Sequence, residues 1–275
     1  MTLRPLALAI FSLAASASAE SHTDVPYRAA PSDEYAARRC VLDIQTPDDT
    51  SDETSADRPA TVVWFHGGGL TSGGKEIPEG LKDRGLIVVA ANYRLAPRVP
   101  VEMCLDDAAA AVAWTLAHIA DYGGDPDRVF VSGHSAGGYL TSMIGLDRSL
   151  LASYDANADR LAGLIPLSGH TITHFTAREQ RGIEGTQPIV DALAPLYHLR
   201  ADCPPILLIT GDREKEMLAR YEENAYLWRM LTLVEHPDCE LFELEGFDHG
   251  GMADAAMPLV VAFVRERVQR MNRGE

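Results

Sequence analysis

The sequence predicts an α/β protein with one mostly parallel, doubly wound sheet, flanked by helices and without a large cap. Apolar runs of strand length recur along the 275 residues and alternate with segments of helical periodicity. Two of these runs end abruptly in glycine-rich turns, at residues 66–69 and 133–138. Because alternating strands and helices build parallel sheets, and no repeat or linker divides the chain, residues 40–275 are expected to form a single domain.

The first 39 residues are expected to lie outside that domain. Residues 1–19 contain Arg4, then an apolar stretch too short to cross a bilayer, then small residues at 17–19. These are the three regions of a secretory signal peptide in their usual order. Cleavage after Ala19 would leave a loose polar arm over residues 20–39 and would make the protein secreted or periplasmic.

The charge of the chain argues against two classes of partner. The formal net charge is −16, and the Lys and Arg residues are scattered along the sequence. Nucleic acids and anionic membrane surfaces attract clustered basic side chains, so neither is expected as a partner. The acidity indicates a well-solvated surface, and the sequence leaves the oligomeric state open.

The cysteines are even in number, which in an oxidising compartment allows up to two disulfides. They are Cys40, Cys104, Cys203 and Cys239. Three pairings are open, and the pair of Cys203 with Cys239 is favoured because each precedes a predicted strand. The spacings do not fit a zinc site, and no metal or organic cofactor is expected.

The elements are predicted in the following order. Strands are expected at 40–45, 61–65, 86–92, from 129, at 161–167, 206–210 and 241–244, and helices at 106–120, 217–234 and 253–271. The run at 40–45 alternates apolar and polar residues, which is typical of an edge strand, whereas the runs at 61–65 and 86–92 are continuous and apolar, as in strands buried on both faces. Residues 47–59 form an acidic loop. Residues 171–201 lack a clear period, so they are either a lid or pocket wall, or a connection containing a helix.

The five residues 133–137, Gly-His-Ser-Ala-Gly, fit the G-x-S-x-G pattern of a nucleophile elbow. A serine on a tight turn from strand to helix exposes its hydroxyl in strained backbone geometry, and side chains on either side would collide across the turn. The pattern alone also fits a glycine-rich junction without catalytic purpose. Ser135 is therefore a candidate nucleophile that needs partners elsewhere in the chain.

A second glycine run, at 66–69, directly follows a predicted buried strand. Exposed amides on such a loop can form half of an oxyanion hole. Residues 69–75 also match the first positions of a phosphate-binding P-loop. Glu76 stands where that motif requires Ser or Thr for magnesium, so the P-loop interpretation is rejected.

A serine nucleophile needs a base, and the base needs an acid to orient it. His249 follows the last predicted strand in a glycine-rich loop, which makes it the best candidate for the base. Asp212 and Glu214 both follow the preceding strand, so both are candidates for the acid. His66 and His134 are expected to have structural roles in the two glycine turns.

Four motifs together resemble one family. The runs 66–69, 93–97 (Tyr-Arg-Leu-Ala-Pro), 123–126 (Gly-Gly-Asp-Pro) and 133–138 look like those of the hormone-sensitive-lipase-like carboxylesterases of the α/β-hydrolase fold. The BD-FAE and arylformamidase-like group, which lacks a large cap, is similar too. The resemblance extends over residues 40–268, and the short arm before the first strand leaves little material for a cap.

The resemblance implies roles for particular residues. It makes Ser135 the nucleophile and His249 the base, with an oxyanion hole formed by the amides of Gly68, Gly69 and Ala136. In many relatives the acid stands three residues after the glycine that ends its strand, which here is Glu214, with Asp212 as the runner-up. A glutamate at this position departs from the more common aspartate.

The activity implied is hydrolysis of small acyl esters through an acyl-enzyme, with a small-molecule ester as the substrate. Within the same fold, an arylformamidase or a carbohydrate esterase acting on acetyl or feruloyl groups is the nearest alternative. A different class is a ligand-binding protein that uses a hydrolase scaffold without catalysis. Ser135 and His249 are both present in the sequence, and this favours an enzyme.

Overall fold

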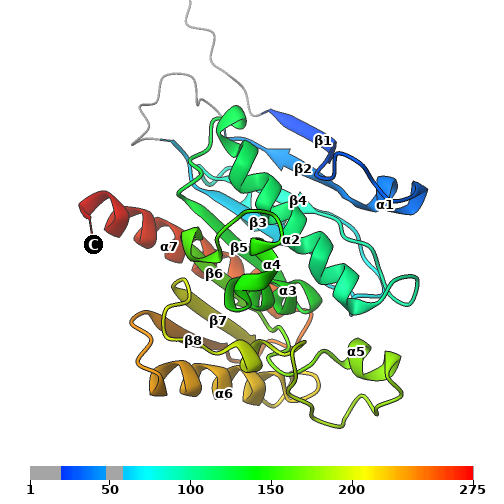
Figure 1. The fold of residues 1–275 in the computed structure, drawn as a ribbon. Helices are drawn as coiled ribbons and strands as arrows, with labels where there is room; N and C mark the ends of the chain where they lie inside the picture. The colour runs from blue at the N-terminus through cyan, green and yellow to red at the C-terminus, as the bar shows by residue number, and fades with distance from the viewer. Residues whose placement is uncertain (1–19, 48–57, 275) are drawn as a thin grey trace, which may run out of the picture.

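The computed structural model describes residues 20–47 and 58–274, and these residues form one eight-stranded sheet (Figure 1). Its strands are β1 (Ser21–Pro26), β2 (Val41–Gln45), β3 (Thr61–Phe65), β4 (Ile87–Ala91), β5 (Val129–His134), β6 (Gly163–Leu167), β7 (Ile206–Gly211) and β8 (Cys239–Leu244). Their order across the sheet is β1-β2-β4-β3-β5-β6-β7-β8. Pairing is antiparallel from β1 through β2 to β4 and parallel from β4 to β8.

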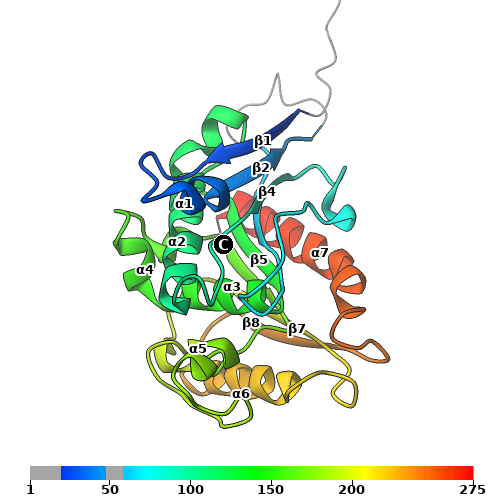
Figure 2. The same cartoon turned by 90° about the vertical axis from the view of Figure 1, so that its right-hand side faces the viewer.

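Helices cover both faces of the sheet, which confirms the doubly wound architecture. They are α1 (Glu34–Arg39), α2 (Val101–His118), α3 (Ala136–Leu146), α4 (Arg148–Ala152), α5 (Phe175–Gln180), α6 (Arg220–Leu233) and α7 (Met252–Arg273). The long C-terminal helix α7 lies on one face, while α2 and α3 lie on the other (Figure 2). None of the helices in the described part of the chain is long and apolar enough to cross a membrane.

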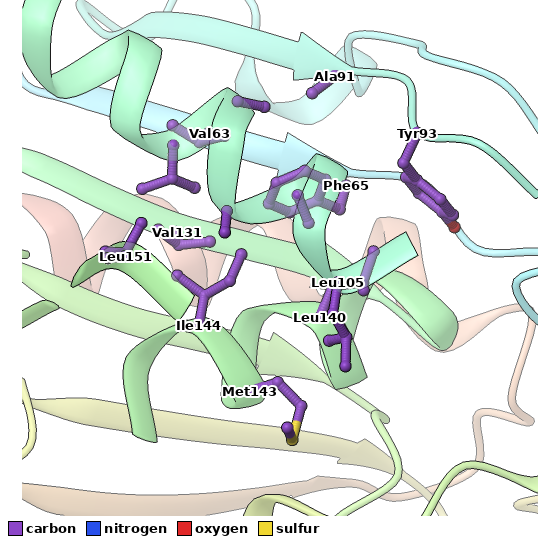
Figure 3. Close-up of a cluster of buried hydrophobic side chains, with 14 of the residues drawn as sticks. Val63, Phe65, Ala91, Tyr93, Leu105, Val131, Leu140, Met143, Ile144 and Leu151 are labelled. Atoms are coloured by element: carbon purple, nitrogen blue, oxygen red, sulfur yellow. The ribbon is translucent and has the colours of Figure 1, made fainter. Parts of the chain in front are cut away.

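The central strands are buried along almost their whole length because each of their faces is covered. Successive side chains of a strand point to opposite faces. Val63 and Phe65 of β3 therefore pack in the core under α2 and α3 (Figure 3), and Val62 and Trp64 pack in a second core under α7. The parallel strands all point in the same direction. The loops that follow the C-terminal ends of β3, β5, β7 and β8 therefore lie together on one side of the sheet.

The N-terminal arm is not loose, which corrects two expectations. Residues 21–26 form β1, which pairs antiparallel with β2, and Asp33 caps α1 by accepting the amide of Ala36. β1, rather than the strand at 40–45, is the edge of the sheet. Most β1 side chains are exposed. An edge strand with so few buried positions carries little hydrophobic signal, and this explains why the sequence pattern read as a polar arm.

The expected disulfides are absent from the described residues, where all four cysteines are free thiols. The favoured pair of Cys203 with Cys239 is not formed. Cys203 is buried against the core, and Sγ of Cys239 lies 3.9 Å from the hydroxyl of Thr232. Burial raises the pKa of the Cys203 thiol to about 12. The predicted signal peptide at residues 1–19 lies outside the described residues, as does most of the acidic loop.

Candidate active site

A sharp turn between β5 and α3 presents the side chain of Ser135. The backbone of Ser135 is held at φ 58° and ψ −114° immediately before the first residue of α3. A Cβ atom on Gly133 would lie 2.6 Å from the carbonyl oxygen of Phe65 in β3, and one on Gly137 would lie 1.9 Å from it. Neither position accepts a side chain, so the turn requires glycine on both sides of the serine.

Two hydrogen bonds connect Ser135 through His249 to a buried carboxylate. The hydroxyl of Ser135 donates to Nε2 of His249 over 2.8 Å, and Nδ1–H of His249 donates to Oε2 of Glu216 over 2.8 Å. A carboxylate at Nδ1 requires the proton on that nitrogen, which leaves Nε2 of the neutral ring as an acceptor. The loops after β5, β7 and β8 thus bring a hydroxyl, a carboxylate and an imidazole into proton-transfer geometry.

The carboxylate is neither of the two that were predicted. Glu214 is exposed, and Asp212 accepts the amides of Glu214 and Gly246 at 2.9 and 2.7 Å. The main-chain carbonyl of Asp212 also accepts the amide of Glu216 at 2.8 Å, which closes one helical turn. This turn brings the side chain of Glu216 back to the end of β7, where its carboxylate accepts the amide of Gly211 over 2.9 Å. The prediction of Glu214, with Asp212 as the runner-up, is wrong because a fixed count from Gly211 ignores this turn.

The carboxyl group of Glu216 is buried and nevertheless ionised. Its side chain is 1% exposed, and burial alone raises the pKa of a carboxyl group. Hydrogen bonds from His249, from the hydroxyl of Ser168 and from the amide of Gly211 outweigh that effect and lower the pKa of Glu216 to about 2. The carboxylate therefore stays charged at neutral pH, where it orients the imidazole and stabilises its protonated form.

The glycine loop after β3 lies against the serine turn. Gly68 and Gly69 have φ of 106° and 63°, and a Cβ on Gly67 would lie 3.3 Å from the Cβ of Ser135. Within the described residues, no hydrogen bond takes up the amides of Gly68, Gly69 or Ala136. Ala136 also begins α3, whose N-terminal amides favour negative charge. The three amides predicted for an oxyanion hole thus have no partner among the described residues, and both Ala136 and the glycine loop, through Gly67, adjoin Ser135.

An arginine from α1 anchors this loop, which the sequence interpretation missed. Nδ1–H of His66 donates to the carbonyl of Gly67 over 2.7 Å, and Arg39 donates to Nε2 of His66 over 3.3 Å. Arg39 also donates to the carbonyls of Tyr93 and Gly73 at 2.9 and 3.2 Å. Burial lowers the pKa of His66 to about 4, so its neutral form, which these bonds require, is the stable one. Arg39 at the end of α1 thus holds the glycine loop in place.

The segment after β6 forms a wall beside the glycine loop. His174 caps α5 by accepting the amide of Thr176, and the hydroxyl of Thr176 donates to the carbonyl of Gly69 over 2.6 Å. A Cβ on Gly69 would lie 3.1 Å from the ring of Phe175. These contacts support the interpretation of residues 171–201 as a pocket wall. The segment also contains a short helix, α5, as the alternative interpretation of a connection with a helix expected.

Fold and site together define a class of protein. The sheet order, the serine turn after β5 and the chain order of serine, acid and histidine are those of the α/β-hydrolase fold. Over the described residues, no group of three or more His, Cys, Asp or Glu side chains is placed to hold a metal ion. The chain is thus an α/β-hydrolase-fold protein with a Ser–His–Glu array.

Comparison with known proteins agrees with this class. Residues 62–190 match a protein family described as having the alpha/beta hydrolase fold. The probable carboxylic ester hydrolase LipM of Mycobacterium tuberculosis is 29% identical in an alignment of 218 positions, which covers 69% of this chain and 50% of LipM. The chain thus spans about half the length, or less, of the first curated relatives that it matches.

Solved structures match almost the whole chain. Esterase 2 of Thermogutta terrifontis, in a butyrate-bound structure, is 26% identical with a TM-score of 0.69, covering 90% of this chain and 94% of the esterase. The same esterase phosphoramylated by tabun is 25% identical with a TM-score of 0.68, covering 92% and 95%. A truncated carbohydrate esterase from gut microbiota has a TM-score of 0.74 at 17% identity, covering 91% and 96%, and this likeness concerns the fold alone.

Proposed function

We propose that the protein is a serine hydrolase that cleaves carboxylic esters of small acyl groups through an acyl-enzyme intermediate. One observation carries this proposal. Ser135, His249 and Glu216 are joined by two hydrogen bonds of 2.8 Å, directly beside the free amides of the glycine loop and α3. A nucleophile with its base, an orienting acid and an oxyanion site are the components that acyl transfer needs.

The mechanism follows from these positions. Oγ of Ser135 attacks the ester carbonyl carbon while Nε2 of His249 takes the hydroxyl proton. The bond from that carbon to the alcohol oxygen then breaks, as His249 gives the proton to the leaving alcohol. Water then attacks the acyl carbon while His249 takes its proton. The bond from that carbon to Oγ of Ser135 breaks as His249 returns the proton to Oγ, and the free acid leaves. The amides of Gly68, Gly69 and Ala136 hold the oxyanion in both tetrahedral intermediates.

The relatives support the same activity. LipM is named a probable carboxylic ester hydrolase, and the T. terrifontis enzyme is an esterase that binds butyrate and is phosphoramylated by tabun. A short acyl chain and a covalent phosphorus adduct are what a small-ester hydrolase with an activated nucleophile would accept. We therefore assign short acyl esters as the substrate class of this chain.

A fluorophosphonate titration tests the proposal. The wild-type protein should be labelled stoichiometrically and should hydrolyse p-nitrophenyl acetate and butyrate, whereas Ser135→Ala should do neither. A wild-type protein that folds but is neither labelled nor active would favour the non-catalytic ligand-binding class instead. N-formylkynurenine and acetylated or feruloylated sugars in the same assay distinguish the narrower arylformamidase and carbohydrate-esterase activities.

We also propose that the chain is exported, to the periplasm or beyond the cell. The support is the order of a basic residue, an apolar stretch and small residues in positions 1–19. N-terminal sequencing of the protein recovered outside the cytoplasm should start at Glu20. Recovery of the intact chain from the cytoplasm alone would reject export.

A further inference from the structure

A hollow of about 320 Å³ lies at the edge of the sheet opposite the candidate active site. The residues just before β3, β4 and β5 line it, among them Ala60, Leu86 and Arg128, together with the last turns of α7. The parallel strands begin at this edge, whereas Ser135 and His249 follow strands at the opposite edge. The hollow is therefore separate from the hydrogen-bonded array.

Four arginines line this hollow, and no carboxylate in the described part of the chain does. They are Arg58, Arg84, Arg128 and Arg265, and we call the site the arginine hollow. This concentration is unusual in a chain whose formal net charge is −16 and whose basic residues are scattered along the sequence. The hollow is therefore a local positive region on an acidic protein.

Three of the four guanidinium groups have no carboxylate partner. Arg128 pairs with Asp125 over 3.2 Å, whereas the other three make no ion pair with any residue that the structure describes. Main-chain carbonyls orient two of them. Nε of Arg84 donates to the carbonyl of Gly80 over 3.2 Å, and Arg265 donates to the carbonyl of Arg84 over 3.1 Å. A guanidinium has five N–H donors, so most of them stay available to a ligand, and a carbonyl does not neutralise the charge.

The number and the chemistry of these donors favour a phosphate group. The planar guanidinium pairs with phosphate and carboxylate oxygens through two parallel hydrogen bonds. A phosphate monoester carries a charge between about −1.5 and −2 at pH 7 and has three terminal oxygens. A carboxylate has a single charge and two oxygens, so a phosphate makes fuller use of several arginines.

The hollow has room for more than the phosphate itself. Its volume of about 320 Å³ lies within the range of small-molecule sites, roughly 300–1,000 Å³. The side-chain amides of Gln269 and Asn272 line it beside the arginines, and amides bind hydroxyl groups. Asn272 accepts a hydrogen bond from Arg128 over 2.6 Å, so its NH₂ group is left for a ligand. Leu86 and Val268 supply apolar contacts for C–H groups, and a sugar ring offers both kinds of group.

We infer that the arginine hollow binds a phosphorylated sugar. The phosphate lies against Arg84 and Arg265, and the sugar hydroxyls lie against Gln269 and Asn272. The net charge of −16 opposes contact with an anionic membrane, which favours a free sugar phosphate over the headgroup of a phospholipid. The inference does not depend on the proposed ester hydrolysis, because the two sites lie at opposite edges of the sheet.

Isothermal titration calorimetry at low ionic strength tests the inference, with glucose 6-phosphate as the probe. The wild-type protein should bind the probe and should not bind glucose at the same concentration. Arg84→Gln and Arg265→Gln should each weaken binding about 10- to 100-fold, because each removes a charge-assisted hydrogen bond. Gln269→Ala should weaken the binding of glucose 6-phosphate and leave that of inorganic phosphate unchanged. All three side chains are exposed, so the variants should fold.

Arg229→Gln is the matched control, because Arg229 is an exposed arginine of α6 that does not line the hollow. It should bind the probe as the wild type does. The inference is overturned if Arg84→Gln and Arg265→Gln bind glucose 6-phosphate as tightly as this control. Glucose that binds as tightly as its phosphate would overturn it too, and inorganic phosphate that binds as tightly as the probe would exclude the sugar part.

Vesicle sedimentation and ester hydrolysis complete the test. The wild-type protein should sediment neither with phosphatidylglycerol vesicles nor with phosphatidylcholine vesicles. Sedimentation with phosphatidylglycerol that Arg84→Gln abolishes, without binding of glucose 6-phosphate, would overturn the free sugar phosphate in favour of a lipid headgroup. Hydrolysis of p-nitrophenyl acetate by Arg84→Gln should match that of the wild type, and a lower rate would contradict the separation of the two sites.

Discussion

Nε2–H of His134 donates to the main-chain carbonyl of His249 over 2.7 Å, and the two imidazole rings lie 4.8 Å apart. Burial, followed by the nearby His249, lowers the pKa of His134 to about 4, so its ring is neutral at pH 7. A carbonyl can only accept, which assigns the proton to Nε2. The residue before the nucleophile therefore holds the loop that carries the base.

Removing this hydrogen bond should slow the reaction without removing any reacting group. We expect His134→Ala to lower kcat about 10- to 100-fold, because a small displacement of the base is costly. His134→Gln, whose amide can donate to the same carbonyl, should recover part of the loss. Steady-state kinetics with p-nitrophenyl acetate measures both variants. His118→Ala, at an exposed histidine, is the control, and a His134→Ala enzyme with wild-type kcat would contradict the positioning role.

Replacing Glu216 should lower kcat strongly, whereas replacing Glu214 should not. Glu216→Gln keeps the shape of the side chain but removes the charge that orients and stabilises the imidazolium, so kcat should fall by about 10³- to 10⁴-fold. Glu214→Gln should stay within twofold of the wild type, because the side chain of Glu214 is exposed. Measuring kcat for both variants on one ester gives the comparison. A larger loss in Glu214→Gln would mean that the loop after β7 rearranges during turnover.

Arg39 should affect catalysis through the glycine loop. Its guanidinium donates to His66, Tyr93 and Gly73, so Arg39→Met should loosen the loop and misplace the oxyanion amides. We expect kcat to fall about 10-fold with little change in KM, because the amides act mainly on the transition state. Arg38→Met is the matched control, since the contact of Arg38 in the described part of the chain is an ion pair with the exposed Glu34. Equal kcat values for the two variants would exclude the anchoring role.

Stability should fall as the pH drops below neutrality. The pKa of His66 is lowered by burial to about 4, whereas an unfolded histidine titrates near 6.5. A depressed folded pKa means that the unfolded state binds the proton first, so the contribution of His66 is complete above about pH 6.5 and is lost progressively toward pH 4. His66 alone should lower the free energy of unfolding by about 2 kcal/mol between pH 7 and pH 5.

Urea unfolding at the two pH values measures this loss. Burial also depresses the pKa of His134, so the wild-type protein should lose more than the share of His66. His66→Gln removes the titrating group, and the difference in stability between pH 7 and pH 5 should shrink by about the same 2 kcal/mol. A wild-type stability that is unchanged over this range would show that His66 is protonated in the folded state.

The sequence alone determined the features that depend on local pattern. Central strands such as β3 are buried on both faces, so their residues form continuous apolar runs. The serine turn needs glycine at 133 and 137 because of contacts that the turn itself creates. The order of the predicted strands places His249 directly after the last strand. The local sequence therefore predicts Ser135 as the nucleophile and His249 as the base.

Only the tertiary structure decided the features that depend on contacts between segments distant in the sequence. One helical turn after β7 brings Glu216 to His249 and leaves Glu214 in solvent. β1 is stabilised by its partner strand and not by its own hydrophobicity, and Arg39 reaches a loop distant in sequence. The physical reason is the same in each case. A hydrogen bond between remote segments leaves no periodic trace in the sequence, whereas burial of a whole strand does.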